Sequence, residues 1–280
     1  MSANYIKRVE INKLWGKHDI VWDKLNPDVN ILVGINGSGK STLLRVIYAA
    51  IARDEKSIAQ CKFESAKIEN QNNWHEIKTT SKNKKSISGG GYEDEFIENC
   101  EFISTFDVPT NKSKLKTDES PLLLELRNLI SIAGTNSFTD YRLKATHSAE
   151  LAIEVNKRID SLFKIINHFF EDTGKTIEID FSNNIVFATE DDNIGLEQLS
   201  AGEKQLLFIL LKVFLMEEKA SVLIMDEPEI SMHLIWQQDL IQTIRTLNPN
   251  IQLIISTHSP SIYSKGWGNR ITFMEKLFVE

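Results

Sequence analysis

The sequence predicts an α/β fold in which helices cover a sheet of parallel strands. A continuous apolar strand at residues 221–225 and a second, mostly apolar strand at residues 251–256 are typical of strands that are buried on both faces. A helical pattern over residues 232–247 lies between them, so the order is strand, helix, strand. A third apolar run, at residues 29–33, precedes a glycine-rich loop and a further helical pattern. These observations favour a parallel sheet whose strand ends carry the functional groups.

Length and composition limit the classes of partner. With 280 residues, 41% of them hydrophobic, the chain can form one large core or a core with an inserted lobe. The net charge of −7 implies no attraction of the whole surface to nucleic acid, so any DNA contact is expected to be local or made by a partner. The first ten residues carry charge instead of a hydrophobic signal region, and no apolar run is long enough to span a membrane. We therefore expect a cytoplasmic protein without membrane contact, with Cys61 and Cys100 as free thiols.

The loop at residues 34–42 has the spacing Gly-x-x-x-x-Gly-Lys-Ser between a strand and a helix, which is the context of a phosphate-binding P-loop. Its glycines let successive backbone N–H groups turn toward phosphate oxygens, and the following helix N-terminus adds partial positive charge. Lys40 is expected to reach the β- and γ-phosphates, and Ser41 to ligate Mg²⁺. The other predicted nucleotide-binding residues are Asn36, Gly37, Ser38, Gly39 and Thr42. A glycine-rich turn with a surface lysine is the alternative, and the flanking strand and helix favour the nucleotide site.

The remaining N-terminal segments predict mainly β structure. Alternating or apolar patterns predict strands at residues 5–11, 19–22, 61–68, 74–80 and 101–106. The first two are expected to pair as a hairpin around Gly16. The polar segment 81–92, which contains three lysines and three glycines, is predicted to be a solvated hairpin tip. Contact of this segment with phosphate or DNA is the less favoured alternative.

Residues 111–173 change character and predict a compact helical lobe inserted into the core. Pro121 opens a helical pattern, and residues 149–171 repeat apolar side chains at helical spacing. A hairpin predicted at residues 176–189 leads back to the core. The predicted domains are an N-terminal half of the core at residues 1–110, the lobe at 111–173 and a C-terminal half of the core at 174–280.

Polar groups follow the two buried strands of the C-terminal third. Asp226 and Glu227 come directly after one strand, at the edge where ligand sites of α/β sheets lie. Asp226 is suited to hold Mg²⁺ through water, and Glu227 to orient or deprotonate an attacking water. His258 follows the next strand, near enough to hydrogen-bond a γ-phosphate. The predicted catalytic residues are therefore Lys40, Glu227 and His258.

The turn at residues 199–203 offers a second phosphate-binding surface. Ser200 supplies a hydroxyl group, Gly202 supplies a glycine backbone, and a very apolar helix begins there. Four separate segments thus fit the chemistry of one nucleotide.

Together these segments resemble the ATPase heads of the ABC type, and particularly the soluble SMC/RecF and OLD-like branch. The matched motifs are Walker A at residues 34–42, Walker B with the catalytic glutamate at 222–227, the signature motif at 199–205 and the switch histidine at 257–260. The Asp-Glu-Pro-Glu sequence is similar to that of AAA-family ATPases in bacterial genome maintenance and anti-phage defence. The resemblance implies a P-loop NTPase head with a mixed central sheet, an antiparallel β-subdomain and an inserted helical lobe.

The chain also departs from the family pattern. Ala201 and Glu203 replace two residues of the Leu-Ser-Gly-Gly-Gln signature of transporter subunits, which disfavours transport. The usual Q-loop glutamine is not at the expected place; Asp107 is a candidate for its metal contact, or an ordinary turn residue. Trp15 and His18 are candidates for stacking on adenine, although a tryptophan in that hairpin is more often a packing residue.

In this family ATP lies between two heads arranged antiparallel, so that the P-loop of one faces the signature motif of the other. The resemblance therefore implies a homodimer in which Ser200 and Gly202 act in trans on ATP and Mg²⁺. It further implies that hydrolysis gates a separate effector protein, a nuclease or toxin, in anti-phage defence. A RecF- or SMC-like ATPase of DNA repair or DNA clamping, which binds DNA, is the first alternative. A cytosolic ATPase subunit of an ABC transporter is the second.

Overall fold

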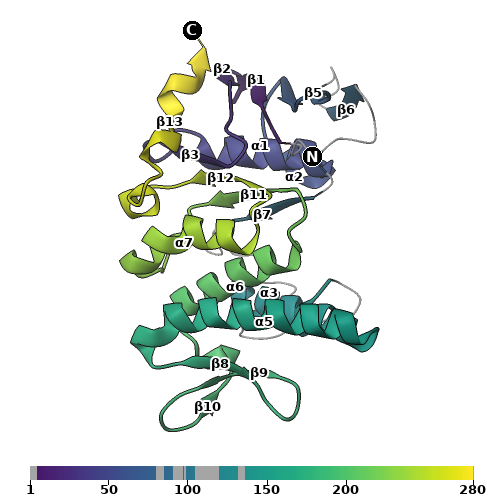
Figure 1. The fold of residues 1–280 in the computed structure, drawn as a ribbon. Coiled ribbons are helices and arrows are strands. Elements are labelled where there is room, and N and C mark those ends of the chain that lie inside the picture. The colour runs from purple at the N-terminus through teal and green to yellow at the C-terminus, as the bar shows by residue number, and fades with distance from the viewer. Residues whose placement is uncertain are drawn as a thin grey trace. The chain divides into compact units, whose positions relative to one another are not determined.

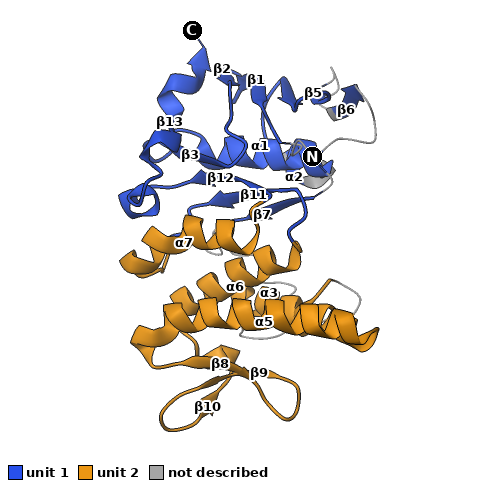
Figure 2. Cartoon of the chain, viewed as in Figure 1, with its two compact units in different colours: residues 1–105, 218–229, 250–280 blue, residues 106–217, 230–249 orange. Residues whose placement is uncertain are grey.

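The computed structural model describes residues 5–79, 85–90, 97, 99–104, 120–131 and 136–279. The chain forms two compact units, which Figure 2 shows in different colours. Unit 1 consists of residues 1–105, 218–229 and 250–280, and unit 2 consists of residues 106–217 and 230–249. The glycine loop and both groups of strand-end residues therefore belong to unit 1, and the signature turn belongs to unit 2.

Unit 1 is built on a five-stranded sheet of order β13-β3-β12-β11-β7, and its pairings are parallel (Figure 1). Its strands are β3 (Val29–Val33), β7 (Cys100–Ile103), β11 (Ser221–Asp226), β12 (Ile251–Ser256) and β13 (Ile271–Phe273). Every residue of β11 and β12 is buried, which explains their mostly apolar sequences. Asp226 is paired with Ser256, and Ser256 with Leu32. The carboxyl ends of three strands therefore meet at one edge.

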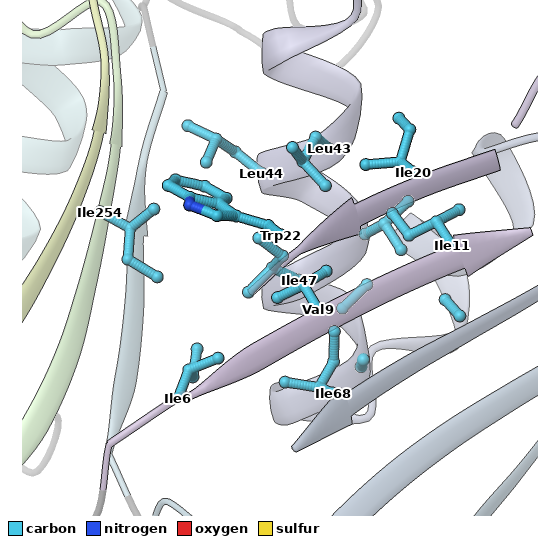
Figure 3. Close-up of a cluster of buried hydrophobic side chains, with 14 of the residues drawn as sticks. Ile6, Val9, Ile11, Ile20, Trp22, Leu43, Leu44, Ile47, Ile68 and Ile254 are labelled. Carbon is cyan, nitrogen blue, oxygen red and sulfur yellow. The ribbon is translucent and has the colours of Figure 1, made fainter. Parts of the chain in front are cut away.

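A second sheet of unit 1 is antiparallel and has the order β14-β2-β1-β4-β5-β6. Its strands are β1 (Arg8–Leu14), β2 (His18–Trp22), β4 (Ser65–Glu69), β5 (Trp74–Thr79), β6 (Lys85–Gly90) and β14 (Phe278–Val279). Helix α1 (Lys40–Ala52) packs against strands of both sheets, and α2 (Glu55–Gln60) follows it. Val9 and Ile11 of β1, Leu43 and Ile47 of α1, and Ile254 of β12 belong to one apolar cluster (Figure 3). This cluster fixes the helix that follows the glycine loop.

Unit 2 contains helices and a small antiparallel sheet. Its helices are α3 (Pro121–Ser131), α4 (Phe138–Leu143), α5 (Ala149–Phe170), α6 (Ala201–Leu215) and α7 (Leu234–Leu247). The sheet has the order β10-β9-β8, with β8 (Thr176–Ile179), β9 (Ile185–Ala188) and β10 (Asn193–Ile194). Helix α6 packs against α3, α5 and α7, and the Phe214 ring of α6 lies 4.7 Å from that of Tyr141. The start of α6, where the signature turn lies, is thus held by a packed core.

The predicted α/β class and the antiparallel β-subdomain are confirmed, but the two kinds of strand pairing lie in separate sheets. The predicted hairpin at residues 176–189 is also confirmed, with Asn183 at φ 73° in its turn. The three-domain division stays a prediction, and unit 2 contains α6 and α7 in addition to the predicted lobe.

The prediction of a solvated hairpin tip is wrong for residues 85–90, because β6 pairs along the whole of β5. A Cβ atom at Gly89 would lie 2.9 Å from the His75 ring, and one at Gly90 would lie 2.9 Å from the Trp74 ring. These glycines let β6 approach two large side chains, so here glycine is compatible with a strand. The other residues of that segment lie outside the described part of the chain.

Candidate functional site

The glycine loop between β3 and α1 has a backbone suited to an anion. Gly37 and Gly39 have φ angles of 77° and 104°, which residues with a side chain rarely adopt. Gly39 is the N-cap of α1, and no side chain there accepts a hydrogen bond from the first turn of the helix. A Cβ at Gly39 would also lie 2.5 Å from the Cη2 atom of Trp15. The loop therefore leaves backbone N–H groups at a positive helix end to meet a phosphate.

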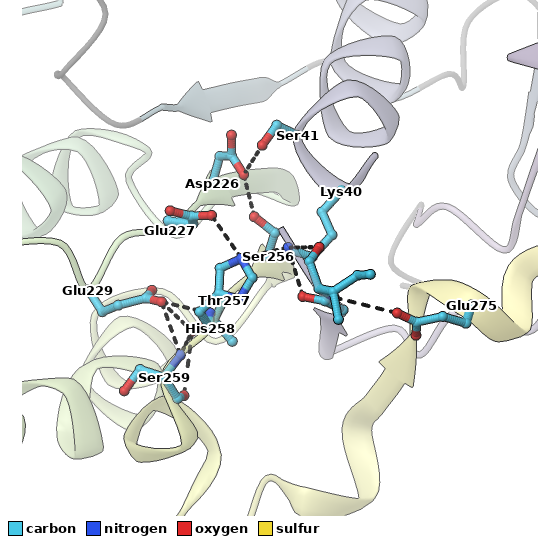
Figure 4. A network of polar contacts seen from close by, with 12 residues as sticks. Lys40, Ser41, Asp226, Glu227, Glu229, Ser256, Thr257, His258, Ser259 and Glu275 are labelled. Carbon is cyan, nitrogen blue, oxygen red and sulfur yellow. Dashed lines mark hydrogen bonds and ion pairs between the residues drawn. The ribbon is translucent and has the colours of Figure 1, made fainter. Parts of the chain in front are cut away.

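Lys40 lies in the centre of a polar network in unit 1 (Figure 4). Its Nζ atom donates to the carbonyl oxygens of Gly34 at 3.0 Å and Ile35 at 3.3 Å, and lies 2.7 Å from Nε2 of His258. Burial lowers the pKa of the Lys40 ammonium group, and the carboxylates of Glu227 and Asp226 oppose this shift. The lysine charge is thus held at the mouth of the loop by oxygen acceptors and acidic neighbours.

Asp226, at the end of β11, reaches the first turn of α1. Its Oδ1 atom accepts a hydrogen bond from Ser41 Oγ at 3.0 Å and another from Ser256 Oγ. The carboxylate is 5% exposed. A hydroxyl and a carboxylate oxygen next to the glycine loop belong to the hard oxygen ligands that Mg²⁺ prefers.

Glu227 and His258 come from neighbouring strand ends and contact each other. Oε1 of Glu227 lies 3.3 Å from Nε2 of His258, the same ring nitrogen that faces Lys40. Glu227 has a φ of 50°, uncommon for a residue with a side chain, and its N–H donates to the Ser256 carbonyl at 2.9 Å. The left-handed backbone turns its side chain toward the loop.

A cavity of about 310 Å³ lies over the glycine loop, the size of a small-ligand site. It is lined by Trp15, Glu227, His258 and six loop or first-turn residues of α1, namely Asn36, Gly37, Gly39, Lys40, Ser41 and Thr42. Trp15 therefore lies at the cavity, as stacking on a base requires, while His18 packs against Phe278 at 5.1 Å between ring centroids. Of the other loop residues, Ser38 has a buried hydroxyl without a hydrogen-bond partner among the described residues.

The signature turn in unit 2 is arranged differently. Ser200 is exposed and caps α6, since its hydroxyl accepts from Glu203 N at 3.2 Å while Glu203 Oε2 accepts from Ser200 N at 2.7 Å. Glu203 is 2% exposed and forms an ion pair with Lys175 at 2.8 Å. Burial by itself raises the pKa of the Glu203 carboxyl, but the bonds from Lys175, Ser200 and Thr173 outweigh it and the pKa is lowered.

Gly202 is buried, and its small size has a structural reason. A Cβ atom there would lie 2.2 Å from the backbone oxygen of Ser231, just before α7. The turn therefore exposes Ser200 and Ala201 at the start of α6, while Gly202 lets two segments of unit 2 meet.

One predicted site residue cannot be compared, and one important residue was missed. Asp107, the candidate metal contact, lies outside the described residues. Glu229 was not predicted as a site residue, yet its carboxylate contacts the segment that carries His258. The signal available was a second glutamate two residues after Glu227.

Comparison with known proteins places the chain among ATPases. Residues 107–264, more than half of the chain, match the family model described as "AAA domain, putative AbiEii toxin, Type IV TA system". The Retron Ec83 probable ATPase of Escherichia coli is 22% identical over 178 residues, which are 56% of this chain and 33% of that protein. The Retron Vc95 probable ATPase of Vibrio cholerae serotype O1 biovar El Tor is 34% identical over 56 residues, 20% of this chain and 11% of that protein. The chain thus spans a third or less of these relatives.

Solved structures with a similar fold include heads of SMC proteins. An SMC head bound to the C-terminal winged-helix domain of ScpA has a TM-score of 0.64 at 13% identity, covering 93% of this chain and 92% of that chain. The SMC head domain from Thermotoga maritima has a TM-score of 0.55 at 13% identity, covering 93% and 91%. These likenesses show the fold, that of a P-loop ATPase head. Among the described residues, no helix combines the length and apolar character needed to span a membrane.

Proposed function

The chain belongs to the family of AAA domains whose model matches residues 107–264. From that premise we propose that it binds ATP with Mg²⁺ and hydrolyses it to ADP and phosphate. One observation carries the proposal: groups from two strand ends, Asp226 and Glu227 of one and His258 of the next, meet Lys40 and Ser41 at the glycine loop. A glycine-rich surface turn with a solvated lysine would not require such a network. Phosphoryl transfer requires it, because catalysis of this reaction depends on positioning and charge neutralisation.

Ser41 and Asp226 would hold the Mg²⁺ ion. The two oxygens lie 3.0 Å apart in a shared hydrogen bond, and both belong to the hard-ligand class. When bound, the ion would neutralise charge on the β- and γ-phosphates. Asp107 is a third candidate ligand of the Mg²⁺ ion in this proposal.

The remaining residues have separate roles in the proposed reaction. The loop backbone from Asn36 to Thr42 binds the phosphates, and Lys40 neutralises the charge that develops on them. Glu227 accepts or orients the proton of the attacking water. The His258 ring, which lies next to both Lys40 and Glu227, contacts the γ-phosphate. Trp15, at the cavity, offers a flat surface for the base.

We also propose that two copies complete the site, with the turn at Ser200 and Gly202 of one copy facing the nucleotide of the other through its exposed residues Ser200 and Ala201, while Gly202 is buried behind them. Support comes from the exposure of Ser200 and Ala201 at the N-terminus of a 15-residue helix. We further propose a role in anti-phage defence, in which this ATPase gates a separate effector, a nuclease or toxin. Support comes from the family description, which names a "putative AbiEii toxin", and from the two retron ATPases among the relatives.

The test is turnover of the Glu227→Gln variant in Mg²⁺ and ATP. The amide keeps the shape of the side chain but cannot take a proton, so we expect kcat to fall at least about a hundredfold while ATP binding persists. Glu178→Gln, which changes an exposed carboxylate of β8, is the matched control and should keep full turnover. Unchanged turnover in Glu227→Gln would remove Glu227 from its role, and no turnover in the unaltered protein would contradict the proposed enzyme.

A further inference from the structure

Glu229 is a buried carboxylate that the proposed chemistry leaves without a role. It is 9% exposed and follows Pro228, two residues after Glu227. Its Oε1 atom accepts three hydrogen bonds: from Thr257 Oγ1 at 2.6 Å, from His258 N at 2.9 Å and from Ser259 N at 3.2 Å. Three donors from consecutive residues on one oxygen form a local anchor for the segment after β12 (Figure 4).

The other carboxylate oxygen shows that this arrangement is costly for folding. Oε2 of Glu229 is buried and has no hydrogen-bond partner among the described residues. A buried carboxylate that is satisfied on one side only is unfavourable unless the bonds that it makes are strong. A neutral apolar residue would avoid that penalty but would leave the Thr257 hydroxyl and the N–H groups of His258 and Ser259 without this acceptor, so the side chain is explained by what it holds in place.

Glu229 also acts together with a second bond between the same two segments. Glu227 N donates to Ser256 O at 2.9 Å, and Glu229 accepts from the N–H group of His258. The segment after β11 is thus joined both to the last residue of β12 and to the segment after β12, next to the Glu227–His258 contact. Thr257 strengthens the anchor, since its hydroxyl donates to Glu229 and accepts from Ser259 N at 2.9 Å.

We propose that Glu229 is a positioning residue that sets the backbone of His258, so that the imidazole lies between Lys40 and Glu227. The inference rests on the proposed ATPase function and deepens it. It assigns the second glutamate of the Asp-Glu-Pro-Glu sequence to the placement of the histidine and leaves the chemical step to other groups.

The first experiment is a double-mutant cycle of Glu229→Ala and His258→Ala, read as kcat and KM for ATP with Mg²⁺. If Glu229 acts through His258, Glu229→Ala lowers kcat at least about tenfold and changes KM less than about threefold. In the His258→Ala background the same change lowers kcat less than about twofold, because the group that it positions is already absent. An equal loss in both backgrounds overturns the inference, since it indicates a general structural role.

Conservative variants separate hydrogen bonding from charge. Glu229→Gln keeps an oxygen acceptor at Oε1 and should retain kcat within about threefold, whereas Glu229→Ala should not. Thr257→Val removes one donor of the three and should lie between these two variants. If Glu229→Gln is as inactive as Glu229→Ala, hydrogen-bond anchoring is contradicted.

A second readout does not depend on turnover. The ¹⁵N resonance of the His258 ring is assigned by its loss in His258→Ala. At fixed pH we expect the chemical shift of this resonance to change in Glu229→Ala and to remain unchanged in the control Glu178→Gln. If the unaltered protein fails to hydrolyse ATP, the proposed function fails while this spectrum still decides the inference. A His258 resonance unchanged by Glu229→Ala overturns it.

Discussion

The glycine loop of unit 1 and the signature turn of unit 2 both precede a helix N-terminus, but they use their charged groups differently. At the loop, Lys40 and Glu227 line one cavity. At the turn, Glu203 points inward and is paired with Lys175, with 2% of its side chain exposed. The loop thus keeps its charges available for a ligand, whereas the turn uses its charges to hold its own fold.

This difference determines whether the loss of a charged group should be measured as a change in ligand binding or as a change in stability. Removing a charge that lines a cavity affects binding first, because that charge meets the ligand directly. Removing one partner of a buried ion pair affects stability, because an uncompensated charge stays inside. The predictions below test this contrast, beginning with the largest expected effect.

Lys175→Met should lower the free energy of unfolding by about 3 kcal/mol, because it leaves the Glu203 carboxylate buried without its counter-ion. Urea denaturation measures this change. Lys157→Met, at an exposed position of α5, is the matched control and should cost less than about 0.5 kcal/mol. Adding Glu203→Gln to Lys175→Met should restore part of the loss. A loss no larger than that of the control would show that the pair contributes little.

The pH dependence of Lys175→Met sharpens the same prediction. In the unaltered protein the pKa of Glu203 lies below its ordinary value of 4.5, so its contribution to stability is present above that value and is lost as pH falls through the lowered pKa. Lys175→Met removes the largest of the bonds that oppose burial, so the pKa of the Glu203 carboxyl should be higher than in the unaltered protein. The stability that is lost as pH falls through the Glu203 pKa should therefore be smaller in Lys175→Met than in the unaltered protein.

Lys40→Ala should weaken ATP binding at least about a hundredfold, because the lysine carries the charge that the phosphates meet. Its free energy of unfolding should change by less than about 1 kcal/mol, in contrast to Lys175→Met. Isothermal titration calorimetry with ATP and Mg²⁺ measures the first quantity and urea denaturation the second. Lys7→Ala, an exposed lysine before β1, is the control. Normal nucleotide affinity in Lys40→Ala would contradict the assignment of the loop.

The sequence predicted the elements whose pattern is local. Strands β3 and β12 begin and end where the apolar runs predicted, and β11 extends one residue further, because strands buried on both faces have no polar alternation to obscure their limits. The spacing of the glycine loop predicted the start of α1, because a loop of this spacing leads directly into a helix. In contrast, the sequence did not predict β6, because Gly89 and Gly90, which permit close packing here, are also typical of turns.

The contacts that the sequence did not predict join residues far apart in the chain. Lys175 and Glu203 are 28 residues apart, as are Glu229 and Thr257. Each contact depends on how a turn meets another turn, and the period of a helix or strand contains no information about this. The catalytic candidates were predictable because strand ends of a parallel sheet share one edge, while their supporting residues were not.

Ser200→Ala should have the smallest effect, a loss of about 1 kcal/mol in the free energy of unfolding, because Glu203 N loses the acceptor that caps α6. Ser200→Asn restores an acceptor and should recover most of this loss. Urea denaturation compares the three proteins. If Ser200→Ala is as stable as the unaltered protein, the cap does not contribute to the fold of the turn.

The central claim is that each nucleotide site needs the glycine loop of one copy and the signature turn of the other. Mixing two inactive variants tests this claim most directly. Lys40→Ala lacks the loop lysine, and Ser200→Asp keeps a capping side chain but places a negative charge at the turn, with Ser200→Asn as its neutral control. In an equal mixture, half of randomly formed dimers are mixed and each has one intact site, so we expect about a quarter of the unaltered ATPase activity. A mixture no more active than the two variants measured separately would contradict the claim.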